Sequence, residues 1–181
     1  MSGAPLYLLR HGEPELAGRM LGRTDCAVTE AGIAACRARA GGLAVEHLVA
    51  SDLRRARDCA GAIGAPAIDP RWRELDFGEW DGLAAAEIDP VALGRFWDDP
   101  DAAPPPGGER WGDLVGRVGS ALAALPDVPT LVVTHGGPMR AALHLLCGFD
   151  RRQVWAFDLP YAALLVLQRH EGGAQIKGLW A

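Results

Sequence analysis

The chain has 181 residues, of which 49% are hydrophobic and 23% are charged, and this composition is typical of one globular domain over residues 1–181. The formal net charge of -5 disfavours a nucleic-acid-binding protein, which needs a basic patch. No apolar run approaches the roughly 20 residues of a membrane span, and residues 1–5 lack a signal-peptide pattern, so we expect a cytoplasmic protein without membrane contact. The cysteines are scattered with no Cys-x-x-Cys pair, which predicts free thiols, no disulfide framework and no zinc site.

The first predicted element is a buried strand over residues 7–9, whose apolar run stops at Arg10 and His11. Gly12 then allows the backbone to turn tightly. In open α/β sheets, ligands bind at the carboxyl ends of strands, where rigidly held side chains face a crevice. Arg10 and His11 are therefore candidate functional residues.

The following segments alternate between helices and strands. A glycine-rich loop over residues 12–28 leads to an alanine-rich helix that reaches about residue 40, with Thr29 as its N-cap. A short strand over residues 47–51 ends at a polar turn, and a helix that contains Arg55 follows. Alternating strands and helices favour a mostly parallel sheet that is covered on both faces.

The middle of the chain is richer in loops. Residues 67–69 are a strand candidate, and residues 73–82 combine carboxylates, aromatic side chains and glycines without a regular period, which is typical of a functional loop. A short helix is expected up to about residue 97. The proline-rich residues 98–108 are too few to divide two domains, and we interpret them as a lid or a surface loop.

The last third of the chain contains a second strand that ends in histidine and glycine. Apolar residues at three- and four-residue steps predict an amphipathic helix over residues 109–125. The strand over residues 130–134 then ends at His135, and a proline-initiated helix follows. Residues 163–180 indicate a hairpin of two strands. The predicted fold is of the α/β class, a three-layer α/β/α sandwich with a mostly parallel central sheet.

Four basic side chains each follow a short apolar run, which would bring them to one edge of the sheet: Arg10, His11, Arg55 and His135. Forked arginine donors neutralise phosphoryl oxygens in the ground state and in the transition state. Helices expected to begin after Gly12 and after Gly136 would add backbone N–H donors. The sequence thus predicts an electropositive phosphate pocket in which Arg10, Arg55 and Gly136 bind the phosphate.

The same pocket would carry acid–base and nucleophilic chemistry. A neutral imidazole, with an unperturbed pKa near about 6.5, attacks phosphorus at neutral pH without a metal or a strong base. One histidine would attack while the second donates hydrogen bonds to the phosphoryl oxygens. A carboxyl group would protonate the leaving alkoxide and then act as the base toward water. Glu74 is our candidate for that role, and Asp76 and Glu79 are the competing carboxylates.

Four stretches together resemble the histidine phosphatase superfamily, also called phosphoglycerate mutase-like: Leu-Arg-His-Gly-Glu at 9–13, Ser-Asp-Leu-Arg-Arg-Ala at 51–56, Glu-Leu-Asp-Phe-Gly-Glu-Trp-Asp-Gly at 74–82 and Thr-His-Gly-Gly at 134–137. By this resemblance, His11 is the phosphorylated nucleophile, Glu74 is the proton donor and His135 completes the catalytic pocket. Arg10 and Arg55 bind phosphate. The resemblance implies a phosphohistidine intermediate with no cofactor and no metal ion.

The chain departs from the mutases of this superfamily in two places. Mutases resemble Arg-His-Gly-Glu-Ser-x-x-Asn at the first motif, whereas Pro14 and Ala17 stand at the serine and asparagine places here. Mutases also carry an Arg-Arg pair ahead of a proline cluster, where residues 96–99 are Phe-Trp-Asp-Asp. We therefore favour a phosphomonoesterase over an isomerase. Residues 22–25 and 105–109 are similar to alpha-ribazole-5'-phosphate phosphatases of the late cobalamin pathway, and the alternatives are a phosphoglycerate mutase or a broad-specificity sugar or small-molecule phosphatase.

The expected partner is a small-molecule phosphomonoester, and the sequence leaves a homodimer open without indicating an interface. A non-catalytic phosphate-binding scaffold of the same fold is a third hypothesis, ranked last because all the catalytic residue types are present. For several other residues we favour structural roles: a solvated helix face for Arg54 and Arg57, structural or surface positions for the motif-free His47, His144 and His170, and the core or pocket wall for Trp72, Trp80, Trp97 and Trp111.

Overall fold

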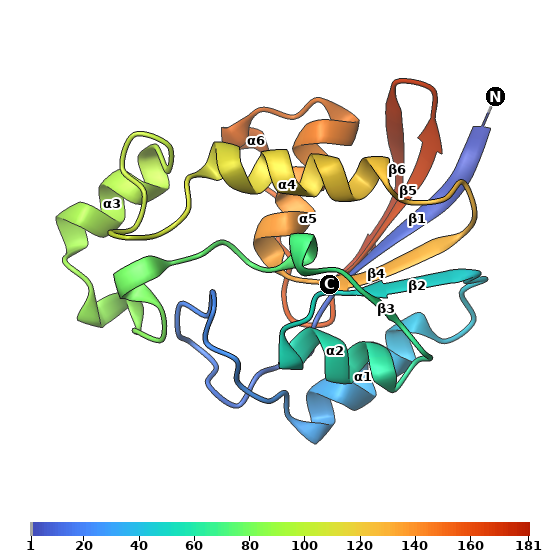
Figure 1. Ribbon diagram of the computed structural model, residues 1–181, viewed down its shortest axis with the longest axis horizontal. Coiled ribbons are helices and arrows are strands. Elements are labelled where there is room, and N and C mark those ends of the chain that lie inside the picture. The colour runs from blue at the N-terminus through green and yellow to red at the C-terminus, as the bar shows by residue number, and fades with distance from the viewer. Residues whose placement is uncertain (1) are drawn as a thin grey trace.

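The computed structural model describes residues 2–181, which form one six-stranded sheet with helices on both faces (Figure 1). The strands are β1 (Ser2–Arg10), β2 (His47–Ala50), β3 (Ala67–Ile68), β4 (Thr130–Thr134), β5 (Leu164–His170) and β6 (Gly173–Trp180). They lie in the order β3-β2-β4-β1-β5-β6. The four strands from β3 to β1 are parallel, β5 runs antiparallel to β1, and β6 runs antiparallel to β5. The predicted α/β class with a mostly parallel sheet is confirmed.

The helices form the two outer layers. They are α1 (Glu30–Ala40), α2 (Arg54–Gly61), α3 (Pro90–Asp98), α4 (Trp111–Ala123), α5 (Gly136–Cys147) and α6 (Arg151–Val154), with single 3-10 turns at Pro70–Trp72, Gly78–Trp80 and Ala85–Glu87. Helices α1 and α2 pack on one face of the sheet and α4 and α5 on the other, while α3 lies in a lobe at the left of Figure 1.

The alternation of side chains along β1 divides the core between the two faces. Leu8 packs beneath α4 and α5, whereas its neighbour Leu9 packs beneath α1 and α2, and both are fully buried. This follows from the two-residue period of a strand. Because both faces of the central strands are covered, the middle of β1 and of β4 carries consecutive apolar side chains, as the sequence predicts for parallel strands, while Thr130 and Thr134 are buried at the ends of β4.

The register of the central strands defines the functional edge. Arg10 pairs with Thr134 across the parallel β1–β4 ladder, and the N–H of His11 donates to the carbonyl of Thr134 at 2.9 Å. Ala50 of β2 pairs with Val133, one step before that point. The residues that follow β1, β2 and β4 therefore leave the sheet at the same carboxyl edge.

Local capping signals place the helix ends where the sequence predicts them. The Thr29 side chain accepts a hydrogen bond from the N–H of Gly32 at 3.0 Å, and α1 begins at the next residue. Gly148 ends α5 in the left-handed region with a φ of 73°, a conformation that glycine adopts without strain.

The helix expected directly after Gly12 is not formed, and that expectation was wrong. No helix lies between His11 and Thr29, and α1 begins only at Glu30. Glycine is required at position 12 because the chain packs closely against α1 there. A Cβ atom on Gly12 would lie 2.2 Å from the carbonyl oxygen of Gly32. Gly12 thus lets the loop after β1 contact the helix backbone. Gly136, in contrast, does begin a helix, α5.

The proline-rich residues 98–108 are docked on the irregular stretch 73–82. The N–H of Glu79 donates to the carbonyl of Pro106 at 2.8 Å, and the N–H of Glu109 donates to the carbonyl of Asp76 at 2.9 Å. Gly78 has a φ of 52°, and a Cβ atom there would lie 2.2 Å from the carbonyl oxygen of Pro106. These two irregular segments therefore support one another.

The predicted state of the cysteines is confirmed. Cys26, Cys36 and Cys59 are buried free thiols, and Cys147 is a half-buried one. Among residues 2–181, none of the helices combines the length and the apolar character needed to cross a membrane.

Candidate active site

His11 lies immediately after β1 and is only 4% exposed. Its Nδ1 atom is 2.7 Å from the carbonyl oxygen of Gly12. A carbonyl oxygen only accepts hydrogen bonds, so Nδ1 carries the proton of the neutral ring and Nε2 keeps a lone pair. The N–H of Gly12 in turn donates to the Sγ atom of Cys59 in α2 at 3.3 Å, which holds the turn in place. The backbone after the strand therefore selects the tautomer of His11.

His135 precedes α5 and faces His11, with the two ring centroids 5.0 Å apart and the planes inclined by 62°. Its Nε2 atom lies 3.0 Å from the hydroxyl oxygen of Ser51, which also accepts the N–H of Leu53 at 3.3 Å. The Nδ1 atom of His135 is buried and has no hydrogen-bond partner among residues 2–181. With Ser51 engaging one ring nitrogen, the other is free for a ligand.

Arg55 of α2 is fully buried and is held by the loop at residues 21–24. Its guanidinium donates to the carbonyl oxygens of Thr24 at 2.8 Å, Leu21 at 2.7 Å and Gly22 at 3.2 Å, while its Nε has no partner. The opposite side of this loop is fixed by Asp81, whose carboxylate accepts three successive backbone N–H groups at 2.7–2.9 Å. Residues 22–25, which resemble a substrate-specific motif, thus serve here to orient Arg55.

Arg10 is held against the loop before β5. Its Nη1 atom donates to the carbonyl of Leu159 at 2.5 Å, and its Cζ atom lies 4.4 Å from the centroid of the Tyr161 ring, a cation–π contact. The Tyr161 ring also lies 5.6 Å from the His11 ring, measured between centroids. The Nε atom of Arg10 is buried without a partner, as in Arg55.

Glu74 is bound by the start of α5. Its Oε1 atom accepts the N–H of Leu75 at 2.8 Å and the N–H of Gly137 at 3.0 Å. A Cβ atom on Gly137 would lie 2.1 Å from that same oxygen, so glycine is required for this approach. The carboxyl group benefits from the partial positive charge at the helix N-terminus.

The backbone of Glu74 is held by Arg117, which reaches across from α4. Its Nη1 atom donates to the carbonyls of Arg71 and Arg73, both at 2.7 Å, and Nη2 donates to the carbonyl of Glu74 at 2.9 Å. Glu109 completes the arrangement with two hydrogen bonds to the same guanidinium, at 2.7 and 2.8 Å. Glu74 is therefore positioned by two helices and not by its own irregular segment alone.

The two competing carboxylates point elsewhere. Asp76 accepts the N–H of Gly78 at 3.0 Å and pairs with Arg23 at 3.1 Å, so it stabilises the loop. Glu79 is exposed. Of the three acidic residues considered from the sequence, only Glu74 lines the cavity that contains His11.

The electrostatic environment keeps both histidines neutral. Burial, followed by the positive charges of Arg55 and Arg10, lowers the pKa of His11 well below its ordinary value of 6.5. Burial and the charge of Arg55 likewise lower the pKa of His135. Burial also lowers the pKa of Arg55 below its ordinary value. An unprotonated His11 is the form that can attack an electrophile.

We expect these histidines to make the ligand-free protein less stable in mild acid. Each has a pKa of about 6.5 in the unfolded chain and a lower one in the folded chain, so the unfolded state binds protons first as the pH falls. The free energy of unfolding should therefore decrease below pH 6.5, by up to about 1.4 kcal/mol per pH unit for each histidine. Urea unfolding in phosphate-free buffer between pH 7.5 and 5 measures this change in the free energy of unfolding.

His11→Gln should reduce this pH dependence, whereas the exposed His170→Gln is the matched control and should leave it unchanged. A free energy of unfolding that stays constant from pH 7.5 to 5 would contradict the lowered pKa values. Carboxylates with lowered pKa values, such as Asp52 beside Arg73, change the free energy of unfolding only at more acidic pH.

The site occupies two adjoining cavities. One, of about 160 Å³, is lined by Arg10, His11, Glu74 and Tyr161 together with residues 19–21. The second, of about 120 Å³, shares Arg10, Glu74 and Phe77 with the first and is otherwise walled mainly by apolar side chains, four of them aromatic. Arg10, His11 and Glu74 thus line a hollow between the sheet edge and the lobe that contains α3. Arg55 and His135 are fully buried beside it.

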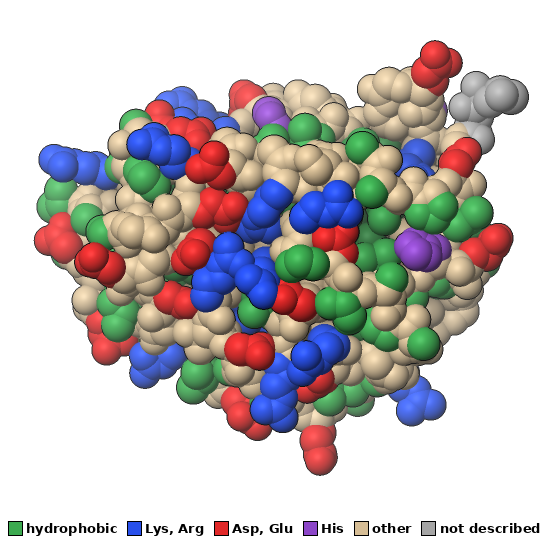
Figure 2. Space-filling view, viewed as in Figure 1, with side chains coloured by type: hydrophobic (Ala, Val, Ile, Leu, Met, Phe, Trp, Pro, Cys, Tyr) green, Lys and Arg blue, Asp and Glu red, His purple; other side chains and the backbone are tan. Residues whose placement is uncertain are grey.

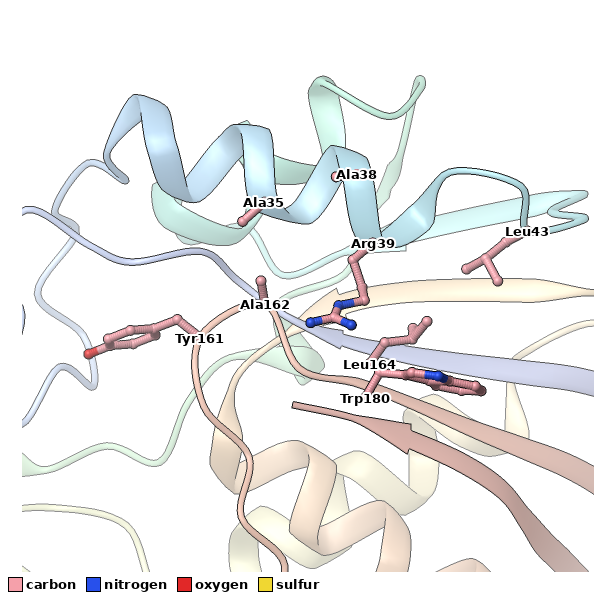
Figure 3. Close-up of a pocket in the computed structure, with 8 residues that line it drawn as sticks. All are labelled: Ala35, Ala38, Arg39, Leu43, Tyr161, Ala162, Leu164 and Trp180. Atoms are coloured by element: carbon pink, nitrogen blue, oxygen red, sulfur yellow. The ribbon is translucent and has the colours of Figure 1, made fainter.

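A larger groove of about 590 Å³ lies between α1 and the β5–β6 pair (Figure 3). It is lined mostly by apolar side chains, with Arg39 the one charged side chain in its wall, and Figure 3 shows that the Tyr161 ring points away from the rest of the groove. None of the candidate catalytic residues lines it, so size alone does not identify the functional cavity.

The structure brings together every site residue that the sequence predicts. Arg10, His11, Arg55 and His135 meet at the carboxyl edge, with Glu74 and Gly136 beside them. Sequence reasoning assigned no role to Ser51, Asp81, Arg117, Arg140 or Tyr161. Only Ser51 and Asp81 carried a signal, since both lie inside the recognised motifs. Among residues 2–181, no three His, Cys, Asp or Glu side chains lie close enough together to hold a metal ion.

The chain has relatives among known proteins. The sequence model of the histidine phosphatase superfamily (branch 1) matches residues 6–180. The chain is 33% identical to glucosyl-3-phosphoglycerate phosphatase of Mycobacterium tuberculosis over 165 residues, which cover 78% of this chain and 74% of that protein. The native structure of the mycobacterial glucosyl-3-phosphoglycerate phosphatase matches with a TM-score of 0.86 at 29% identity and covers 98% of both chains.

Some relatives are longer than this chain. A bifunctional protein of Mycobacterium tuberculosis is 33% identical over 187 residues, which cover 93% of this chain and 51% of that protein. The chain thus spans about half the length of the first curated relatives that it matches.

Proposed function

Because the chain belongs to the histidine phosphatase superfamily, we propose that it is a phosphomonoester hydrolase that forms a phosphohistidine at His11 and needs no metal ion. The observation that carries this proposal is the hydrogen bond from Nδ1 of His11 to the Gly12 carbonyl, which leaves the lone pair of Nε2 free in a neutral ring. Its lowered pKa maintains that form at neutral pH.

In the first step, Nε2 of His11 attacks the phosphorus atom and the bond from phosphorus to the ester oxygen breaks. Glu74 supplies a proton to the departing oxygen, which leaves as an alcohol. The carboxyl group lies on the rim of the His11 cavity and is held by two backbone N–H groups, so its position is defined before substrate binds.

In the second step, the Glu74 carboxylate takes a proton from water as the water oxygen attacks the phosphohistidine. The nitrogen–phosphorus bond breaks and its electron pair returns to Nε2, which restores the enzyme. One carboxyl group thus acts first as the acid and then as the base.

The phosphoryl oxygens meet donors from several elements. Arg10 and Arg55 each present a guanidinium without a carboxylate partner, and His135 presents a ring nitrogen that no protein group occupies. The N–H groups at the start of α5, beginning with Gly136, add a preorganised anion site. These donors stabilise charge on the oxygens without moving protons.

The identity of the leaving group is decided by comparing the rates of hydrolysis of different phosphomonoesters. Relatives are named for glucosyl-3-phosphoglycerate, and the stretches 22–25 and 105–109 resemble alpha-ribazole-5'-phosphate phosphatases of the cobalamin pathway. The absence of the mutase residues at positions 14, 17 and 96–99 supports hydrolysis over isomerisation. A broad-specificity phosphatase is the alternative to a dedicated one.

The test is phosphate release, in the presence of EDTA, from p-nitrophenyl phosphate, glucosyl-3-phosphoglycerate, alpha-ribazole-5'-phosphate, 3-phosphoglycerate and several sugar phosphates. We expect release from at least one compound, unaffected by EDTA, and no conversion of 3-phosphoglycerate to 2-phosphoglycerate. Loss of activity on chelation, or isomerisation without phosphate release, would overturn the proposal.

A further inference from the structure

Three arginines at the site lack any anionic partner. Arg10, Arg55 and Arg140 each have a buried Nε atom without a hydrogen-bond partner, and none forms an ion pair among residues 2–181. Other arginines near the site are neutralised within the protein: Arg23 by Asp76, Arg73 by Asp52 and Arg117 by Glu109. Acidic and basic side chains also lie next to one another over the face that Figure 2 shows. The three guanidiniums at the site therefore combine a buried Nε atom with the absence of an ion pair.

A buried guanidinium without a counter-ion is costly, because the charge loses its hydration and gains no partner. A bound phosphate dianion offsets two such charges, and in the proposed mechanism these belong to Arg10 and Arg55. Glu74 is neutral when it acts as the acid in the first step. One guanidinium, that of Arg140, then has no anion to bind.

Arg140 lies on α5, one turn from Gly136. Its Nη2 atom donates to the carbonyl of Phe157 at 3.2 Å, its Cζ atom lies 4.5 Å from the ring centroid of Trp155, and its Nη1 atom makes no hydrogen bond among residues 2–181. Burial lowers its pKa, while the nearby carboxylates of Glu74 and the exposed Asp158 partly offset this without forming an ion pair with it. The free Nη1 is thus the atom available to a ligand.

The free Nη1 atom lies near the carboxyl group of Glu74, which donates the proton to the leaving group in the proposed mechanism. A Cβ atom at Gly136 would be 3.0 Å from Nη1 of Arg140, 3.8 Å from Oε2 of Glu74 and 3.9 Å from Cζ of Arg10. These three groups therefore converge on one point above the start of α5. Since Glu74 must reach the ester oxygen, the atoms bonded to that oxygen come within reach of Arg140.

The adjoining cavity suits a small anionic group. It measures about 120 Å³ and contains Arg10, Glu74 and Arg140, and its wall is otherwise largely aromatic: Phe77, Phe96, Trp97, Trp111 and Trp155. Apolar walls limit the access of water, and a charge-assisted hydrogen bond is stronger in such surroundings. A guanidinium binds a carboxylate with two parallel hydrogen bonds.

We propose that Arg140 binds a carboxylate on the leaving group, so that the substrate is a phosphomonoester with a carboxylate close to the ester oxygen. This inference rests on the proposed function. It makes alpha-ribazole-5'-phosphate, which has no carboxylate, a poor substrate.

The test uses a matched pair of substrates, 3-phosphoglycerate and glycerol 3-phosphate, which differ in a carboxylate against a hydroxymethyl group. For the native chain, kcat/KM should be roughly 10- to 150-fold higher for the carboxylated compound, the range of a hydrogen bond between charged groups. Arg140→Gln should bring the ratio toward one, mainly through KM, and Arg140→Lys should restore part of it. Arg152→Gln, an exposed arginine on α6, is the matched control and should keep the native ratio.

A native ratio near one, or a high ratio that survives in Arg140→Gln, would overturn the carboxylate assignment while leaving hydrolysis intact. Should Arg140→Gln fail to fold, the native ratio and the Arg140→Lys ratio still decide the question. If none of the compounds in the phosphate-release panel, nor glycerol 3-phosphate, releases phosphate, the proposed function fails, and the inference fails with it. Phosphate release from any compound of that panel thus separates the two failures.

Discussion

His11→Ala is expected to reduce kcat for phosphate release by at least about 10⁴-fold, because removal of a covalent nucleophile eliminates the reaction path and leaves only binding and charge stabilisation. Incubation of the native protein with a ³²P-labelled substrate, followed by rapid denaturation at alkaline pH, should trap a phosphohistidine. The variant should trap none. The fold should persist, since the ring makes its one hydrogen bond to the neighbouring Gly12 carbonyl.

The matched control is His170→Ala, which removes an exposed histidine on β5 and should keep native kcat and native labelling. Circular dichroism and thermal unfolding show whether the His11 variant is folded. Turnover within tenfold of native in a folded His11→Ala protein would refute the assignment of the nucleophile. Labelling that persists in that variant would place the phosphoryl group on another residue, with His135 the nearest candidate.

Glu74→Gln is expected to have the second largest effect, and that effect should depend on the leaving group. An alkyl phosphate must be protonated as it departs, so kcat should fall by about 10²- to 10⁴-fold, the usual contribution of a general acid. p-Nitrophenolate leaves without a proton, so its first step should be much less affected. Glutamine retains the size of the side chain and can still accept the N–H groups of Leu75 and Gly137.

Burst kinetics with p-nitrophenyl phosphate separate the two steps in this variant. Phosphohistidine should accumulate because Glu74 is also the base for water, so a burst of p-nitrophenol should precede slow turnover. Glu79→Gln is the matched control, since Glu79 is exposed and outside the cavity. Equal losses for alkyl and p-nitrophenyl substrates without a burst would rule out the acid–base role of Glu74.

Features that depend on a few neighbouring residues were predictable from the sequence. An apolar run predicts a buried strand, and the sudden change to Arg10-His11 and to His135 identifies the functional edge, because parallel strands present their carboxyl ends together. Thr29 and Gly148 define helix ends through local hydrogen bonding and backbone conformation. These signals are local, so they can be interpreted without any knowledge of the tertiary structure.

The tertiary structure decided everything that requires side chains from distant segments to meet. Ser51 contacts His135, which lies 84 positions later in the sequence, and Arg117 reaches 43 positions back to the carbonyl of Glu74. No spacing pattern encodes such pairs, because loops of variable length separate them. The same limit explains the wrong helix after Gly12, where contact with α1 and not a helix start requires the glycine. Chain-local chemistry thus predicted which residues are candidates for the reaction, and three-dimensional packing determined which residues orient them and where the unpaired Arg140 lies.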